Sequence, residues 1–165
     1  MTNLPQIVIY TDGSALGNPG PGGYGAILMM GHHRKELSGG FRLTTNNRME
    51  ILGAIKGLET LNERCKVEIY SDSQYVINSI TKGWARKWQT KGWMRNKTEK
   101  ALNSDLWERL LALVSAHEVV FHWVRGHTGV EENERADRLA VDAAQGQVLP
   151  VDEGYEGVNT REIQA

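Results

Sequence analysis

Short runs of β-branched and aromatic residues alternate along this chain with longer stretches in which apolar residues recur at helical spacing. Runs of the first kind are typical of strands. They predict five strands, at Gln6–Thr11, Tyr24–Met30, Lys35–Leu43, Lys66–Ser71 and Val119–Val124. Short connections join the first three, which favours an antiparallel meander.

The apolar positions with helical spacing predict helices between these strands. One contains Ile51–Leu61, and Asn47 followed by Glu50 resembles a capping box that opens it. Further helices are expected at Ser73–Thr81, at Ser104–His117 and around Ala136–Ala144. The segment Gly13–Gly25 is rich in Gly and Pro and is predicted to be a turn-forming loop. Three strands followed by alternating strands and helices predict an α/β fold in a single domain, with a five-stranded mixed sheet (three antiparallel strands, then parallel strands) and helices on both faces.

Composition agrees with one globular domain. The chain has 165 residues, of which 40% are hydrophobic and 24% charged. No apolar run reaches membrane-spanning length, and the N-terminus lacks the layout of a secretory signal. Cys65 is the single cysteine, which excludes an intramolecular disulfide and favours a cytoplasmic location.

Charge is distributed unevenly along the chain. The net charge of −1 argues by itself against a nucleic-acid binder, but seven Lys or Arg residues and one acid lie between Lys82 and Lys100. From Glu131 to the end there are nine acids and three Arg. We therefore expect a folded unit at 1–146 that carries a basic protrusion at 82–100. An acidic, Gly-containing tail follows at 147–165, with a composition compatible with disorder.

Acidic residues stand at points where the predicted elements place them near one another. Asp12 and Asp72 each follow a buried strand, and the carboxyl ends of strands are where open α/β sheets bind ligands. Glu50 is expected in the first turn of its helix and Asp137 in the first turns of the last helix. Carboxylates brought together repel one another unless a cation intervenes, and Mg²⁺ and Mn²⁺ prefer such oxygen ligands. Two such ions suit hydrolysis of a phosphodiester.

Each acid also has a simpler interpretation. Asp12 can be a turn residue, and Asp72 with Ser73 can cap the next helix. Glu50 can be only the capping partner of Asn47, and Asp137 can be a solvated helix residue paired with Arg135 or Arg138. Taken one at a time, Asp12 and Glu50 favour these interpretations; only the combination with the flanking motifs reverses them.

The flanking motifs resemble those of the bacterial ribonuclease HI family. They are TDGS at Thr11–Ser14, GNPGPGGYGAIL at Gly17–Leu28, TTNNRME at Thr44–Glu50, SDSQYV at Ser71–Val76 and GHTGVEENERADRLA at Gly126–Ala140. They occur in the family's order with similar gaps, and the resemblance covers roughly Ile7 to Ala144. It implies a ribonuclease H-like domain, a type 1 ribonuclease H that cuts the RNA strand of RNA–DNA hybrids and leaves 5′-phosphate and 3′-hydroxyl ends.

The resemblance also implies roles for residues. Asp12, Glu50, Asp72 and Asp137 would bind two Mg²⁺ ions, with Mn²⁺ as an alternative, and form the catalytic set together with His127. An imidazole titrates near neutral pH and suits proton handling or product release. For His127 alone, an exposed loop histidine is the simpler interpretation.

The expected partner is an RNA–DNA hybrid, bound by a monomer that does not associate with a membrane. Amides read a 2′-hydroxyl well, and the candidate amides are Asn18, Asn46, Asn47 and Gln74, which turn and cap chemistry can also explain. The resemblance implies that the protrusion meets the DNA strand. Its candidate contacts are Trp84, Arg86, Lys87, Trp88, Lys91 and Trp93; tryptophans packed against the body are the less favoured explanation. The alternatives to a nuclease of this kind are a non-catalytic hybrid-binding module and a fold-related DNA nuclease or integrase.

Overall fold

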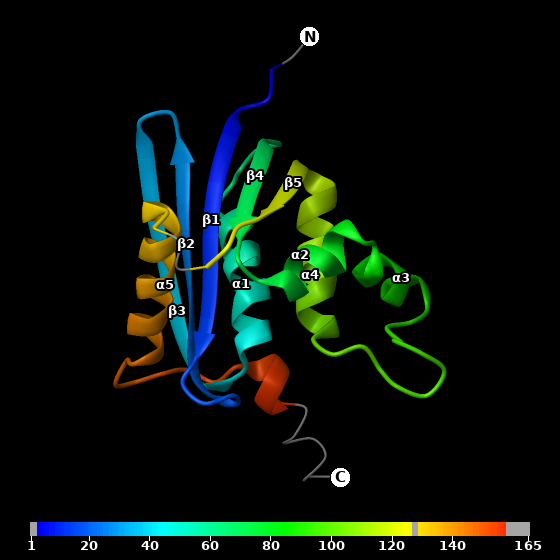
Figure 1. The fold of residues 1–165 in the computed structure, drawn as a ribbon. Coiled ribbons are helices and arrows are strands. Elements are labelled where there is room, and N and C mark those ends of the chain that lie inside the picture. Colours follow the sequence, from blue (N-terminus) through cyan, green and yellow to red (C-terminus); the bar gives the residue numbers. More distant parts are fainter. Residues whose placement is uncertain (1–2, 127–128, 158–165) are drawn as a thin grey trace.

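The computed structural model describes residues 3–126 and 129–157 and contains one mixed sheet. Its strands are β1 (Gln6–Ala15), β2 (Gly20–Met30), β3 (His33–Thr44), β4 (Lys66–Ser71) and β5 (Glu118–Trp123), in the order β3-β2-β1-β4-β5 (Figure 1). β1, β2 and β3 pair antiparallel, whereas β4 pairs parallel with both β1 and β5. The predicted five-stranded mixed sheet is confirmed.

Helices cover both faces of this sheet, as the pattern predicted. They are α1 (Asn46–Glu59), α2 (Gln74–Thr81), α3 (Trp84–Thr90), α4 (Ser104–Ala116) and α5 (Glu131–Ala144). α5 crosses β1, β2 and β3 on one face, while α1 lies against β1 and β2 on the other, with α4 packed beside α1 toward β5 (Figure 1). Within the described part of the chain, no helix is both long and apolar enough to cross a membrane.

The main core lies between the sheet and α1 with α4. Ile9, Ile55 and Leu58 are fully buried there, and burying each such side chain contributes about 1.5–3 kcal/mol. Trp107 of α4 is also fully buried, and its indole N–H donates to the Tyr75 hydroxyl at 3.0 Å. A buried indole with a satisfied N–H fixes α4 against α2.

The predicted loop at Gly13–Gly25 is wrong in its extent. β1 continues to Ala15 and β2 begins at Gly20, so only 16–19 form the turn. The glycines serve packing instead: a Cβ on Gly23 would lie 2.4 Å from the Ala140 carbonyl oxygen, and one on Gly25 would lie 2.3 Å from that of Ala136. Only residues without a side chain allow the α5 backbone to approach the sheet this closely.

The first part of the acidic tail also differs from the expectation of disorder. The Arg42 N–H donates to the Pro150 carbonyl at 2.9 Å, and Asp152 is buried against Arg48. Residues 153–157 form a short helix. The folded body therefore continues past 146 as far as the structure describes it.

Candidate active site

Asp12 and Asp72 lie side by side because of the strand register. β1 and β4 pair in parallel with Tyr10 opposite Tyr70, and each acid comes two residues later. Parallel strands bring their carboxyl ends to the same edge of a sheet, so the two carboxylates meet there. Asp12 is only 7% exposed, and its Oδ1 accepts the Gly13 N–H at 2.8 Å.

Glu50 reaches the same edge from α1, although not from the first turn. The N-cap of α1 is Thr45, whose hydroxyl accepts the Arg48 N–H at 3.2 Å, so the predicted capping box of Asn47 and Glu50 is wrong. Glu50 lies in the second turn, where α1 packs on Gly13: a Cβ on Gly13 would lie 2.3 Å from the Glu50 nitrogen. Among the described residues, Glu50 Oε2 is buried and has no hydrogen-bond partner.

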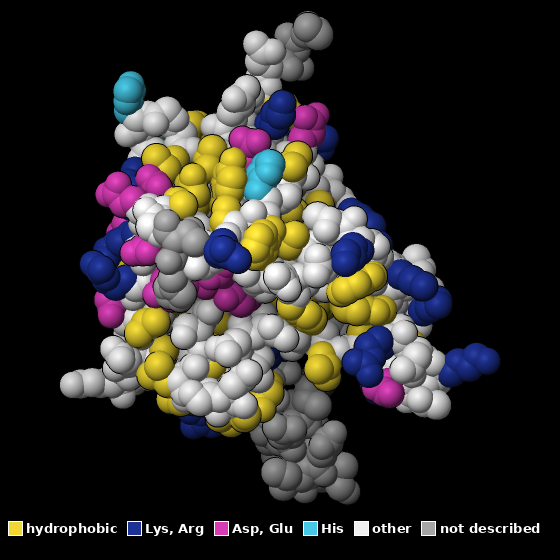
Figure 2. All heavy atoms as spheres, viewed as in Figure 1, with side chains coloured by type: hydrophobic (Ala, Val, Ile, Leu, Met, Phe, Trp, Pro, Cys, Tyr) yellow, Lys and Arg dark blue, Asp and Glu magenta, His cyan; other side chains and the backbone are white. Residues whose placement is uncertain are grey.

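The three acids form a candidate metal site. One carboxylate oxygen from each of Asp12, Glu50 and Asp72 lies within 4.8 Å of the others. Asp137, in the second turn of α5, lines the same cavity of about 390 Å³, together with Gly13, Ser14, Asn46, Asn47 and Ser73. Acidic side chains are visible at the centre of this face in Figure 2.

Burial and mutual repulsion disfavour the charged forms of these carboxylates when no cation is bound. Burial, together with the charge of Asp72, raises the pKa of Asp12 to about 8. Burial and then Asp12 raise the pKa of Glu50 well above its ordinary value. A divalent cation would offset the repulsion and satisfy the unpartnered Glu50 oxygen, so the donor set fits a hard metal ion.

The end of β5 supports Asp72 in two ways that sequence patterns did not reveal. The Trp123 indole N–H donates to the Asp72 carbonyl at 3.2 Å. Gly126, just after β5, lies directly against the Asp72 carboxylate, and a side chain there would not fit because its Cβ would lie 2.6 Å from Asp72 Oδ2. Gly126 opens the motif GHTGVEENERADRLA, but the sequence alone does not reveal its contact with Asp72, because that contact depends on the pairing of β4 with β5. The neighbouring His127 lies outside the described residues.

Of the four candidate amides, Asn46 and Asn47 line the cavity of the acids, whereas Asn18 and Gln74 lie outside its lining. The Asn46 N–H donates to Asn18 Oδ1 at 3.1 Å, and Asn46 Oδ1 accepts the Ala15 N–H at 2.6 Å. These bonds tie the β1–β2 turn to the start of α1. Gln74 is exposed in the first turn of α2, and the N-cap of that helix is Ser73, whose hydroxyl accepts the Val76 N–H at 3.2 Å. Asp72 is therefore not needed as a cap.

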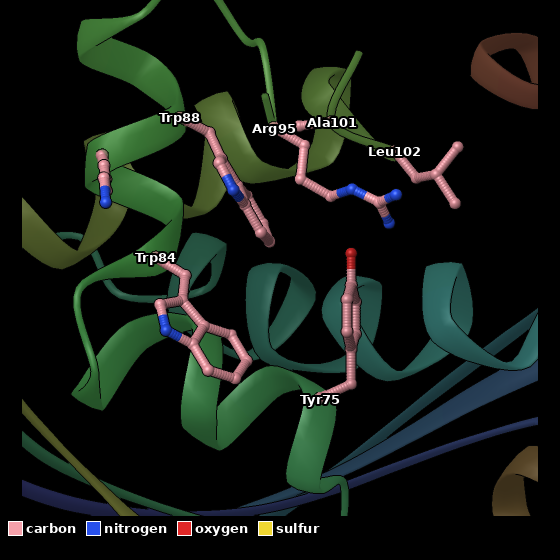
Figure 3. A pocket seen from close by; sticks show the side chains of 7 residues that line it. Tyr75, Trp84, Trp88, Arg95, Ala101 and Leu102 are labelled. Carbon is pink, nitrogen blue, oxygen red and sulfur yellow. The ribbon is translucent and has the colours of Figure 1, made fainter. Parts of the chain in front are cut away.

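A second cavity of about 430 Å³ lies in the basic protrusion. Trp84, Trp88 and Lys87 line it, together with Tyr75, Arg95, Ala101 and Leu102. Figure 3 shows the Trp84 and Trp88 rings facing the cavity and the Arg95 guanidinium directed toward the Tyr75 hydroxyl. In Figure 2 an apolar patch near α3 is surrounded by Lys and Arg side chains. Arg95 is one of the seven cations counted in this segment, whereas sequence reasoning did not single out Tyr75, although it stands inside the SDSQYV motif.

The protrusion residues do not all face this cavity. Trp84 is 40% exposed, with the Lys82 ammonium 5.4 Å from its ring centroid. Trp88 and Trp93 pack partly against the core, and Trp88 meets Trp107 edge to face at 6.4 Å. Packing thus accounts for part of the surface of Trp88 and Trp93, and Trp88 also lines the cavity. Two further candidates, Arg86 and Lys91, lie outside the cavity lining, and Arg86 donates to Ser115 of α4 at 3.3 Å.

A mixed sheet of order β3-β2-β1-β4-β5, with carboxylates gathered at the ends of its adjacent parallel strands, defines the class of ribonuclease H-like proteins. The RNase H family model matches residues 5–145. Ribonuclease H of Syntrophus aciditrophicus is 64% identical over 150 residues, which are 91% of this chain and 87% of that protein. Ribonuclease HI of a Synechocystis species is 53% identical over 157 residues, 94% of this chain and 98% of that one.

Solved structures agree with these relatives. LC9-RNase H1, a type 1 RNase H with the type 2 active-site motif, is 33% identical with a TM-score of 0.80, covering 96% of this chain and 82% of its own. LC11-RNase H1, solved in complex with an RNA/DNA hybrid, is 26% identical with a TM-score of 0.63, covering 84% and 96% of the two chains. The chain belongs to the type 1 ribonuclease H family, whose members cleave the RNA of RNA–DNA hybrids.

Proposed function

We propose that Asp12, Glu50, Asp72 and Asp137 hold two Mg²⁺ ions and that the chain hydrolyses RNA in hybrids to 5′-phosphate and 3′-hydroxyl ends. The convergence of three carboxylate oxygens within 4.8 Å carries this proposal. Asp137 lines the same cavity and supplies the fourth acid. Mn²⁺ is the alternative ion, because it shares the preference for carboxylate oxygen.

The chain's own residues prepare this reaction by position and charge. When bound, the cations supply the positive charge that a phosphodiester needs while its bond to oxygen is cut. Asp12 and Asp72 are held at the sheet edge by strand pairing, and Glu50 by the packing of α1 on Gly13. His127, which follows Gly126, is proposed to exchange a proton or to assist product release.

The proposed substrate is an RNA–DNA hybrid, the ligand of the LC11-RNase H1 complex. Asn18, Asn46, Asn47 and Gln74 are proposed to read the 2′-hydroxyls and backbone near the acids. The protrusion is proposed to hold the DNA strand, with Trp84 and Trp88 packing on sugars or bases while Arg86, Lys87, Lys91 and Trp93 extend the same surface. The chain is proposed to act as a monomer in the cytoplasm; its buried, free Cys65 suits a reducing compartment.

Cleavage of labelled duplexes tests the function. The protein is incubated with a hybrid, a DNA duplex and an RNA duplex, each with and without Mg²⁺. We expect cutting of the RNA strand of the hybrid, only when Mg²⁺ is present. Binding of the hybrid without cutting would favour the non-catalytic module, and cutting of the DNA duplex would favour a fold-related DNA nuclease.

Replacing Lys87 and Lys91 by Ala is expected to weaken hybrid binding about threefold to tenfold at low salt and to leave kcat almost unchanged. Each lost phosphate contact reduces the slope of log K against log salt by about 0.9, so the slope should fall by about 1–2. Lys35 and Lys66 lie near the other end of the sheet, and Lys35→Ala with Lys66→Ala is a control of equal charge. An equal slope in the test and control variants would remove the protrusion from the substrate path.

A further inference from the structure

The segment 149–157, here called the C-terminal strap, lies beyond the residues that the family model matches. It is attached to β3 by the bond from the Arg42 N–H to the Pro150 carbonyl. The Arg42 guanidinium also donates to both carboxylate oxygens of Glu156, at 2.9 and 3.0 Å. These contacts bring the strap across the chain toward the start of α1.

At that point a charged cluster is buried. Arg48 is 3% exposed and Asp152 6% exposed. Arg48 donates to Asp152 from Nε at 2.8 Å and from Nη2 at 3.0 Å, and the Thr44 hydroxyl donates to Asp152 Oδ2 at 2.7 Å. Two-point bonds between a guanidinium and a carboxylate fix orientation as well as distance.

The remaining N–H groups of Arg48 are also used. Asp105 of α4 accepts from Nη1 at 2.9 Å and from Nη2 at 2.7 Å, and the Asn103 side chain accepts from Nη1 at 3.4 Å. A Cβ on Gly154 would lie 1.9 Å from Asp105 Oδ2, so the strap fits tightly over the pair. Arg48 therefore joins three segments, and removal of either acid leaves a buried charge partly unpaired.

This cluster is coupled to the candidate substrate residues through a short path. Arg48 lies in the first turn of α1, two residues after Asn46. Asn46 holds the β1–β2 turn through its bonds with Ala15 and Asn18. A shift of the first turn of α1 would thus move both Asn46, which lines the cavity of the acids, and the β1–β2 turn bonded to it. The strap is connected to the substrate surface without lining its cavity.

We propose that Asp152 is a positioning residue for hybrid binding, which fixes the first turn of α1 and, through Asn46, the β1–β2 turn. The inference rests on the substrate role proposed above for Asn18 and Asn46. Asp152 is outside the catalytic set, so its loss should change KM for the hybrid and not the rate of the chemical step. Asp152 can fix the position of Asn46 because the two residues that donate hydrogen bonds to it, Thr44 and Arg48, lie on either side of Asn46 in the sequence.

The test compares Asp152→Asn with Glu59→Gln. Glu59 pairs with Arg109 at 3.1 Å between the same helices α1 and α4, at the far end of α1, so this control removes an equal charge away from the site. At 25 °C, with both variants shown to be folded by circular dichroism, Asp152→Asn should raise KM for the hybrid about fivefold to tenfold and change kcat less than twofold. Hydrogen exchange at the Ala15 amide should accelerate only in Asp152→Asn.

A double-mutant cycle separates positioning from general stability. If Asp152 acts through Asn46, its effect on KM should fall to less than half in the Asn46→Ala background. Should Asp152→Asn fail to fold, Thr44→Val removes one bond to Asp152 and takes its place in the cycle. A lower melting temperature with unchanged KM, or additive effects in the cycle, would overturn the proposal. Failure of the wild type to cleave the hybrid would instead refute the proposed function.

Discussion

Asp72→Asn is expected to lower the rate of hybrid cleavage by at least about 10³-fold while the fold is retained. The substitution keeps the shape of the side chain but removes one of the charges that hold the cations, and a loss of about 4 kcal/mol of transition-state stabilisation corresponds to that factor. Asp72 is not the cap of α2, and its carbonyl bond to Trp123 involves the main chain, so neither structural role is lost. The measurement is single-turnover cleavage with Mg²⁺ in excess.

The same variant should be more stable than the wild type when no divalent cation is present. Asp72 raises the pKa of Asp12 and that of Glu50, so its neutralisation relieves repulsion in a buried cluster. A gain of about 1 kcal/mol would raise the melting temperature by about 2–4 °C in a chain of this size. Asp142→Asn, at an exposed position of α5, is the matched control for both effects. Activity that persists in Asp72→Asn would refute the site.

Much of this site could be predicted because the point at which each strand ends is a local property of the sequence. The runs that end before Asp12 and Asp72 are recognisable as strands, and if two such strands are parallel neighbours their next residues meet at one edge. The helix start was predicted two residues late because Thr45 and Asn47 are both good N-cap residues. The choice between them depends on Asn46, which the β1–β2 turn holds inside the first turn of α1.

Other features depend on partners that are distant in sequence. The composition at Gly20–Gly25 suits a turn and also a surface on which a helix packs closely, and only the position of α5 decides between them. Asp152 stands in an acidic, Gly-containing stretch with no periodicity, and its burial results from Arg48, 104 residues away. The sequence around Trp88 is rich in cations and suggests a surface aromatic, whereas in the fold its ring packs against Trp107 of α4. Such contacts leave no pattern in the neighbouring sequence.

Without divalent cations, the protein is expected to lose stability as the pH rises from about 4 to about 8. The pKa of Asp12 is raised from 3.8 to about 8 in the folded state, so folding retains a proton that the unfolded chain releases in this interval. The stabilisation from that proton is complete below pH 4 and is lost as the pH passes through 8. At about 1.4 kcal/mol per pKa unit, the rise from 3.8 to about 8 corresponds to a total loss on the order of 6 kcal/mol, with Glu50 acting in the same direction.

Chemical denaturation between pH 4 and pH 9 in EDTA measures this loss, and Asp12→Asn isolates its origin. His117, whose pKa is lowered by burial, favours stability at higher pH, but it is present in both proteins and cancels in their difference. Saturating Mg²⁺ should stabilise the wild type more at pH 8 than at pH 5, because the cation and the proton compete for the same oxygens. Equal Mg²⁺ stabilisation at the two pH values, or an equal pH dependence in Asp12→Asn, would show that the raised pKa does not arise from the acids that bind the metal.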